Sequence, residues 1–155
     1  MSKLNKFLYF IFSLIFFSCF DIYFSALILN FLRFNFEQNK FIDLIYIQNT
    51  GAAFSILENS QPFLILFSVF TILFLVVFVI KNIQKNSLIS LFWLSMLISG
   101  IGCNLYERIC YGYVRDFFKL NFIEFPVFNI SDIFINISVI ALVILILKKR
   151  GYFKI

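Results

Sequence analysis

The sequence predicts an all-α membrane protein with four transmembrane helices. Of its 155 residues, 62% are hydrophobic and only 14% are charged, whereas soluble domains average about 45–50% apolar and about 25% charged residues. The apolar residues gather in four stretches, and each could cross a hydrocarbon core, which needs about 20 helical residues. These observations exclude a water-soluble globule. We expect one integral membrane domain over residues 1–155.

Each predicted span begins or continues for a local reason. The first is interrupted only by Asp21, after which the apolar run resumes. Pro62 is well placed to open the second, because the first turn of a helix does not need that N–H group. Pro126 stands in a similar position before the fourth. The spans are predicted at about residues 7–32, 62–80, 88–105 and 127–147.

Basic residues mark one side of the membrane. Eight of the 13 lysines and arginines precede the first span, lie between the second and third, or follow the fourth: Lys3, Lys6, Lys81, Lys85, Lys148, Lys149, Arg150 and Lys154. By the positive-inside rule these segments and both termini are cytoplasmic. All eight carboxylates then fall at or beyond the outer half of the membrane. Acid chemistry is therefore expected to face outward, and no soluble basic domain is left to bind nucleic acid.

The N-terminal segment also resembles a secretory signal peptide, and Ser18 and Cys19 resemble the end of a lipoprotein cleavage box. Phe16 and Phe17, however, are bulky where such boxes prefer smaller residues. Removing the segment would leave three spans and break the charge topology. We therefore expect it to remain as the first transmembrane helix.

Polar residues between the spans concentrate in two outer segments, residues 34–61 and 106–126. In the first of these, Phe41 to Ile47 is rich in β-forming residues but alternates imperfectly. This pattern predicts a strand at the membrane interface.

The absence of histidine removes the commonest metal ligand and the usual base of serine and cysteine hydrolases. Cys19, Cys103 and Cys110 lack the paired spacing of a zinc or disulfide framework and are interpreted as small apolar residues. Two lysines fall on the outer side, Lys40 and Lys119, and neither flanks a serine, which argues against a serine–lysine dyad. We expect no metal and no cofactor.

Asp116 and Asp132 are the candidate catalytic residues, because each lies among apolar residues close to a predicted helix end. Ionisable groups at membrane depth are costly and usually functional. The third and fourth spans form a hairpin that closes on the outer side, so both carboxylates can reach one depth. Two close carboxylates in a poorly solvated site share a proton, which supplies both an acid and a base for hydrolysis by water.

A structural explanation of the same residues is also open. Asp132 could simply cap the fourth helix, while Asp116 could pair with Arg115 or Lys119. Three asparagines at the ends of spans, Asn49, Asn104 and Asn129, could orient substrate or carboxylates through their amides, or serve only as caps. Arg108 could pair with the adjacent Glu107 or act electrostatically on the aspartates.

The surroundings of these residues form motifs in a fixed order: NTGAAFS at 49–55, NLYER at 104–108, GYVRDF at 112–117 and FNISD at 128–132. Together they closely resemble the motifs of lipoprotein signal peptidase, or signal peptidase II, over roughly residues 21–140. One such motif would be weak evidence. Their order on a scaffold with four predicted spans is specific.

The resemblance implies a membrane aspartyl endopeptidase with a small extracytoplasmic β-cradle and a periplasmic loop or helix over the site. Such enzymes sit in the bacterial inner membrane and cut prolipoproteins just before a diacylglyceryl-modified cysteine. Asp116 and Asp132 fall on the catalytic aspartates of the family. Its supporting and cleft-shaping positions fall on Asp21, Asn49, Gly51, Ala53, Phe54, Asn104, Arg108 and Asn129.

Several positions depart from the family pattern. After Asp21 the family has glutamine and then lysine, where this chain has Ile22 and Ser25. Cys103 replaces a glycine and Ser131 an alanine, while Glu107 replaces an aspartate and keeps its charge. None of these substitutions touches the two aspartates, so activity is expected.

The resemblance further implies lipid and diacylglyceryl-prolipoprotein partners and inhibition by cyclic peptide antibiotics. A single copy contains every part of the mechanism, so a monomer is expected. The main alternative is a small proton- or cation-coupled transporter, which would need ionisable residues near mid-membrane on both halves of a pathway. A membrane scaffold without activity would give the clustered polar residues no purpose.

Overall fold

Four helices and two strands make up the part of the chain that the computed structural model describes, namely residues 1–32, 40–51, 57–58 and 60–149. In chain order they are α1 Lys3–Leu32, β1 Ile42–Asn49, α2 Gln61–Asn82, α3 Leu88–Tyr111, β2 Val114–Leu120 and α4 Ile130–Lys149. All four helices are long and apolar enough to cross a membrane. The predicted fold class is confirmed: a four-helix membrane protein with a small antiparallel sheet.

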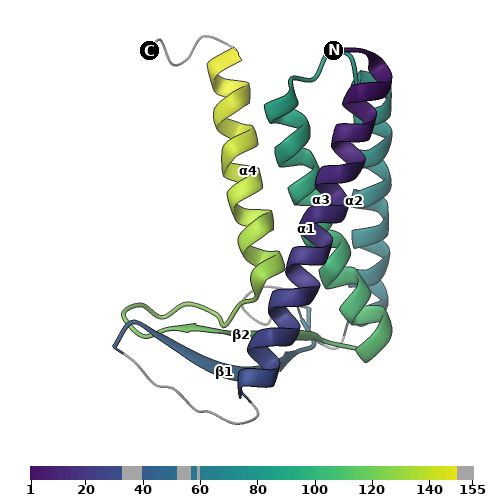
Figure 1. Ribbon diagram of the computed structural model, residues 1–155. Helices are drawn as coiled ribbons and strands as arrows, with labels where there is room; N and C mark the ends of the chain where they lie inside the picture. The colour runs from purple at the N-terminus through teal and green to yellow at the C-terminus, as the bar shows by residue number, and fades with distance from the viewer. Residues whose placement is uncertain (33–39, 52–56, 59, 150–155) are drawn as a thin grey trace.

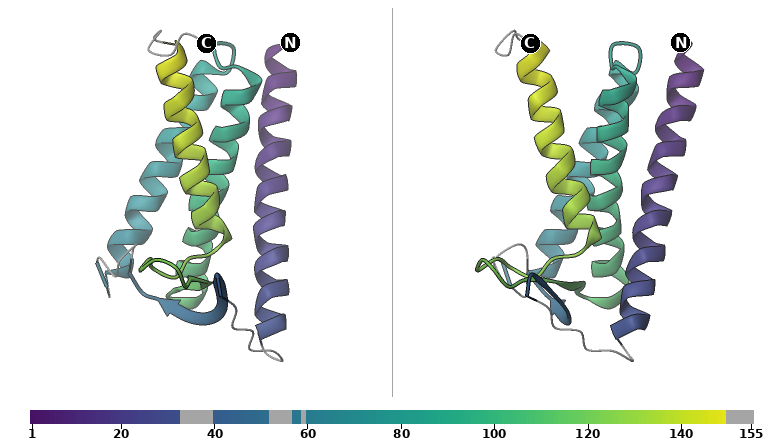
Figure 2. Two further views of the ribbon diagram at one scale, coloured as in Figure 1. Left: turned by 90° about the vertical axis from the view of Figure 1, so that its left-hand side faces the viewer. Right: turned by 60° about the vertical axis from the view of Figure 1, so that its left-hand side comes forward.

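Helix α3 forms the centre of the bundle and packs against α1, α2 and α4 (Figures 1 and 2). The start of α1 and the end of α4 lie at one end of the bundle, and the sheet lies at the other. The membrane topology predicted from the basic residues requires this arrangement, because four crossings return the chain to the side from which it started.

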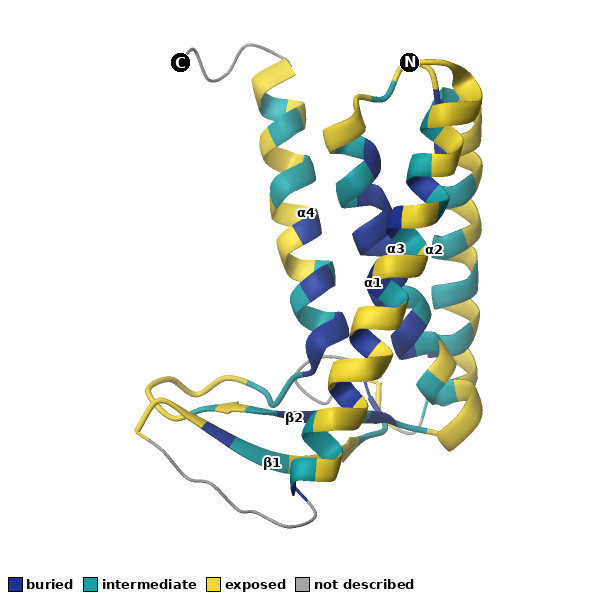
Figure 3. Cartoon of the chain, in the orientation of Figure 1, coloured by how far each residue is buried: buried dark blue, intermediate teal, exposed yellow. Residues whose placement is uncertain are grey.

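Much of the outside of the bundle is exposed, as the yellow stretches on the helices in Figure 3 show, and many of these exposed residues are large and apolar. On α2, for example, Phe67, Phe70 and Phe74 are all more than 60% exposed. In water such a surface would drive aggregation, whereas lipid tails solvate it. The composition therefore reflects a protein whose outer surface is as apolar as its core.

Two apolar clusters hold the bundle together. One lies near the chain termini and includes Phe10 of α1, Val79 of α2 and Leu91 of α3. The other lies at the sheet end, where Phe17 of α1 and Phe134 of α4 pack edge to face with ring centroids 5.3 Å apart. This second cluster also contains the side chain of Phe117 from β2, so the sheet is fixed to the helices beneath it.

The two strands pair in an antiparallel sheet with Ile47 opposite Asp116. Strand β1 begins one residue after the predicted start at Phe41 and continues two residues beyond Ile47 to Asn49, while β2 was not predicted. A short bridge then joins β2 to the chain entering α4, since the backbones of Phe118 and Phe128 exchange hydrogen bonds of 2.9 and 3.1 Å. This bridge brings Asp116 beside the N-terminus of α4.

Three helix ends differ from the prediction by three residues or more, and one of them is the start of α1, which lies at Lys3 rather than at about residue 7. Helix α3 continues to Tyr111, six residues or about 9 Å beyond the predicted end at Leu105. The prediction followed the apolar residues alone, whereas the helix continues through the more polar residues after them. It ends at Gly112, whose φ of 79° is left-handed and favours glycine. Helix α4 begins at Ile130, three residues late, because Phe128 is engaged in the bridge to β2.

Candidate functional site

Strand β2 carries Asp116 into a nearly closed polar pocket, where the residue is only 1% exposed. Both carboxylate oxygens accept hydrogen bonds from amides. Asn49 Nδ2 donates to Oδ2 at 2.9 Å, and Asn129 Nδ2 donates to Oδ1 at 3.0 Å. The ion pair of Asp116 with Arg115 that remained open from the sequence is not formed, because Arg115 binds Glu107.

Asp132 lies in the first turn of α4, close to a helix end as expected. It accepts a hydrogen bond from Asn104 Nδ2 at 2.9 Å and one from the backbone N–H of Asn129 at 3.2 Å. In return, its own N–H donates to Asn129 Oδ1 at 2.9 Å. Asp132 therefore does cap the helix, but its second oxygen faces α3.

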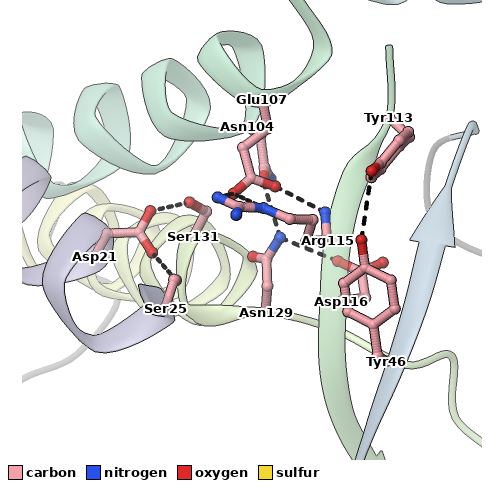
Figure 4. Close-up of polar contacts among 10 residues, drawn as sticks. All are labelled: Asp21, Ser25, Tyr46, Asn104, Glu107, Tyr113, Arg115, Asp116, Asn129 and Ser131. Carbon is pink, nitrogen blue, oxygen red and sulfur yellow. Dashed lines mark hydrogen bonds and ion pairs between the residues drawn. The ribbon is translucent and has the colours of Figure 1, made fainter. Parts of the chain in front are cut away.

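Asn129 joins the two carboxylates. Besides Asp116, its Nδ2 reaches Asn104 Oδ1 at 3.0 Å (Figure 4). Asn104 in turn binds Asp132. The polar chain thus runs from Asn49 through Asp116, Asn129 and Asn104 to Asp132, using donors from β1, α3 and the start of α4. The sequence placed these five residues at the ends of elements, and the fold brings them together.

The electrostatic state of Asp116 follows from its surroundings. Burial and, after it, the nearby charge of Asp132 together raise the pKa of this carboxyl group to about 7. The hydrogen bond from Asn49 and the charge of Arg108 oppose this change. At neutral pH the group is therefore poised between its acid and base forms, which general acid–base catalysis requires.

Arg108 does not pair with its neighbour Glu107, which corrects one of the two possibilities left by the sequence. Its Nη2 donates to the backbone oxygen of Gly51 at 2.9 Å, and its Nη1 reaches Asn104 O at 3.4 Å. Its charge acts on both aspartates. Gly51 also donates its N–H to Asn49 Oδ1 at 2.9 Å, so Arg108 and Asn49 hold the chain after β1 from two sides.

Glu107 instead forms the ion pair of this region with Arg115, at 2.6 Å between Oε1 and Nη2. Its second oxygen accepts the backbone N–H of Arg115 at 2.7 Å. The guanidinium group also stacks over the ring of Tyr111, 4.6 Å from its centroid. These contacts fix the turn from α3 into β2 and leave Asp116 without a direct cationic partner among the described residues.

A cavity of about 240 Å³ opens beside Asp132, and Asp116 is not among its lining residues. Asn49, Asn104, Arg108 and Asp132 form its polar part. The rest of its lining is mostly apolar and comes from Val114, Phe125, Pro126, Val127, Phe128, Ile135 and Asn136. Sequence reasoning missed these lining residues. Asn136 could have been found from its i+4 spacing to Asp132 on one helix face.

Asp21 lies apart from this polar chain, buried in α1. Its Oδ1 accepts a hydrogen bond from Ser25 Oγ at 3.1 Å, and its Oδ2 accepts one from Ser131 Oγ. Because Ser131 precedes Asp132, Asp21 reaches the site through one residue (Figure 4).

Two residues predicted to shape the cleft, Ala53 and Phe54, lie outside the described residues. The resemblance implied a loop or helix over the site, and no helix is found among residues 40–51, 57–58 and 60, which are the described part of the segment between α1 and α2. Within the described chain, no three cysteine or carboxylate side chains gather as a metal ion would need.

Comparison with known proteins gives consistent matches. The family described as Signal peptidase (SPase) II matches residues 10–148. The lipoprotein signal peptidase of Caldicellulosiruptor bescii is 43% identical over 110 residues, covering 71% of this chain and 70% of that protein. The lipoprotein signal peptidase of Clostridium tetani is 38% identical over 115 residues, covering 72% and 73% of the two chains.

Solved structures agree with this result. One described as a bacterial membrane enzyme superposes with a TM-score of 0.81 at 30% identity, covering 94% of this chain and 91% of the other. A second with the same description gives a TM-score of 0.70 at 28% identity, with 93% of each chain covered.

Proposed function

The chain belongs to the signal peptidase II family of peptidases, and we propose that it removes the signal peptide from diacylglyceryl-modified bacterial prolipoproteins, cutting just before the lipidated cysteine. The observation that carries the proposal is a pair of carboxylates, Asp116 and Asp132, linked through the amides of Asn129 and Asn104. A transporter finds no support in the family match.

The proposed reaction is direct attack of water on the scissile carbonyl. Asp132 is the proposed base, because the partial positive charge at the N-terminus of α4 favours its ionised form. Asp116 is the proposed acid, because its pKa is raised to about 7, mainly by burial. Asp132 takes one proton from water as the oxygen bonds to the carbonyl carbon. Asp116 gives its proton to the carbonyl oxygen, which yields a tetrahedral intermediate with two hydroxyl groups. Asp132 then passes its proton to the amide nitrogen while Asp116 takes a proton back from one hydroxyl, so the C–N bond breaks, the amine leaves and both carboxyl groups return to their starting states.

The amides fix this division of roles. Asn49 and Asn129 hold both oxygens of Asp116, so its carboxyl plane cannot turn. Asn104 holds one oxygen of Asp132. The Nε of Arg108 is buried and lacks a hydrogen-bond partner among the described residues, so it is available to donate to a substrate carbonyl. Gly51, which Arg108 holds by its oxygen, begins the segment proposed to shape the cleft together with Ala53 and Phe54.

The lipid on the substrate supplies specificity. Its acyl chains would lie in the bilayer beside the bundle, where each buried methylene contributes about 0.8 kcal/mol. The apolar walls of the cavity and its polar floor suit a peptide that enters from the membrane surface. A lipidated cysteine therefore anchors the substrate while the bond before it meets the carboxylates. Cyclic peptides that occupy this cleft are proposed inhibitors, and one copy of the chain suffices for activity.

The site is proposed to face away from the cytoplasm. Lys3 and Lys6 lie at the bundle end opposite the sheet, as do Lys81 and Lys148. Positive charge at that end favours a cytoplasmic location for both termini. The sheet and the carboxylates then lie at the outer surface, where exported prolipoproteins arrive.

Cleavage of a lipidated prolipoprotein by the purified protein in detergent or liposomes tests the proposal. Asp116→Asn and Asp132→Asn should each abolish turnover, because each removes a group that must exchange a proton. Glu124→Gln is the matched control, since it neutralises an exposed outer carboxylate away from the polar chain. Full activity in either aspartate variant would refute the carboxylate mechanism.

A further inference from the structure

The first turn of α4 is held from two other helices at a single residue, Ser131. This serine directly precedes Asp132 and is only 2% exposed. From one side, Asp21 of α1 accepts the hydrogen bond of its hydroxyl group. From the other side, its backbone oxygen lies against α3 at Gly100. The residue next to the proposed base is therefore fixed by both its side chain and its backbone.

The approach of α4 to α3 depends on the missing side chain at Gly100. A Cβ atom there would stand 2.7 Å from the oxygen of Ser131, 3.0 Å from Ile135 Cγ1 and 3.2 Å from Phe134 Cβ. The first contact is with backbone and cannot be relieved by turning a side chain, so α4 would have to move. Gly102, two residues along the same helix, has nothing within 4 Å of an added Cβ.

This close approach bears directly on the carboxylate pair. Asn104 lies one helical turn beyond Gly100 on α3, and its amide reaches Asp132 at 2.9 Å. That distance leaves little slack, because a hydrogen bond weakens steeply once it lengthens beyond about 3.2 Å. A displacement of α4 at Ser131 would therefore separate Asp132 from Asn104 and, through Asn129, from Asp116.

The hold from α1 is built from residues at which this chain departs from the family pattern. Ser25 donates to one oxygen of Asp21 and Ser131 to the other, and the thiol of Cys103 also faces this carboxylate. A buried carboxylate must find donors, and here they are neutral groups from three helices. The three departures thus converge on one side chain, which ties α1 to the first turn of α4.

We propose that Gly100 and Asp21 are positioning residues that hold Ser131 between α3 and α1 and so set the place of Asp132 in the proposed carboxylate pair. The inference rests on the proposed function, since it explains how that pair is kept together. Neither residue touches the substrate. Their effect is on geometry, and a misplacement of about 1 Å at a reacting group can lower a rate about 100-fold.

Gly100→Ala, with Gly102→Ala as its matched control, tests the hold from α3. Gly100→Ala should lower kcat at least tenfold, whereas Gly102→Ala should keep full activity. A wild-type kcat in Gly100→Ala, or an equal loss in both variants, would overturn the proposal. Should Gly100→Ala fail to fold, a double-mutant cycle with Asp21→Asn and Ser131→Ala decides instead. Additive effects on kcat there would refute the hold from α1.

A readout without turnover separates this proposal from the proposed function. The infrared carboxyl band that disappears in Asp116→Asn can be titrated in wild type and in Gly100→Ala. Moving Asp132 away should lower the pKa of Asp116 towards its ordinary value, while Glu107 and Arg108, the other charges acting on it, stay in place. A lowered pKa of Asp116 in Gly100→Ala, found together with a wild-type protein that cleaves no prolipoprotein, would refute the proposed function alone. An unchanged pKa of Asp116 together with an unchanged kcat in Gly100→Ala would refute the positioning role alone.

Discussion

Asn49 offers a quantitative test of how the carboxylate pair holds its proton. Because the pKa of Asp116 is raised to about 7, and because the proposed reaction needs this group protonated, kcat/KM should fall as the pH rises through neutrality. At pH 6 about nine-tenths of the molecules carry the proton, and at pH 8 about one-tenth. The wild-type rate should therefore drop about tenfold between these two values.

Removing the amide of Asn49 should move the alkaline limb of the pH–rate profile, that is, the pH range over which kcat/KM falls. Its Nδ2 donates to Asp116 Oδ2 at 2.9 Å and stabilises the charged form. A hydrogen bond to a charged group contributes about 1.5 kcal/mol or more, and about 1.4 kcal/mol corresponds to a tenfold change in proton affinity. In Asn49→Ala the limb should therefore lie about one pH unit higher. The maximal rate should also fall, because Asn49 orients the carboxyl group.

The assay is the initial rate of cleavage of a lipidated fluorogenic peptide in micelles from pH 5 to pH 9. Only the position of the limb tests the reasoning, since many substitutions lower the maximal rate. Gln48→Ala on the same strand is the control, because Gln48 is exposed and its Nε2 reaches only Tyr46 OH, at 3.5 Å. A limb that stays in place or moves to lower pH in Asn49→Ala would refute the account.

Three further outcomes are expected. Since folding raises the pKa of Asp116, the native protein binds more protons than the unfolded chain between about pH 4 and pH 7, and the free energy of unfolding falls as the pH rises through this window. Thermal unfolding in detergent should show a smaller fall for Asp116→Asn than for the wild type. An identical fall in both proteins would contradict the burial argument. Gly112→Ala should lower the unfolding temperature by a few degrees, since a Cβ at a φ of 79° costs about 1 kcal/mol, whereas Gly102→Ala should not. A chelator should leave the cleavage rate unchanged, and strong inhibition by EDTA would require a metal site that the proposed mechanism does not use.

The sequence predicted the parts of the molecule whose signals are local. Long apolar runs predicted the helices because lipid requires each span to satisfy its own backbone. Asp116 and Asp132 were identified because isolated carboxylates in apolar surroundings need a reason to be there. Pro62 lies in the first turn of α2, as expected. In each case one short stretch of chain carries both the signal and its physical cause.

Contacts between residues that are distant in the sequence could not be predicted from such local signals. Glu107 has an arginine beside it at 108, yet it binds Arg115, because a helix turns adjacent side chains about 100° apart and the turn at Gly112 folds Arg115 back. Strand β2 was missed because its alternation is weak, with Asp116 and Phe117 both buried. Its pairing with β1, rather than its own pattern, makes it a strand.

The same distinction explains where the chain can vary without loss of the site. The backbone bridge between Phe118 and Phe128 fixes the step from Asp116 to Asn129, so the loop over residues 121–127 adds nothing to the alignment of the carboxylates. From Phe128 to Asp132, by contrast, each residue has a fixed task as bridge, cap, buried anchor or proposed base. Insertion or deletion of one residue there would turn α4 by about 100° and carry Asp132 away from Asn104. The spacing inside this short motif is therefore a geometric requirement, whereas the length of the loop before it is not.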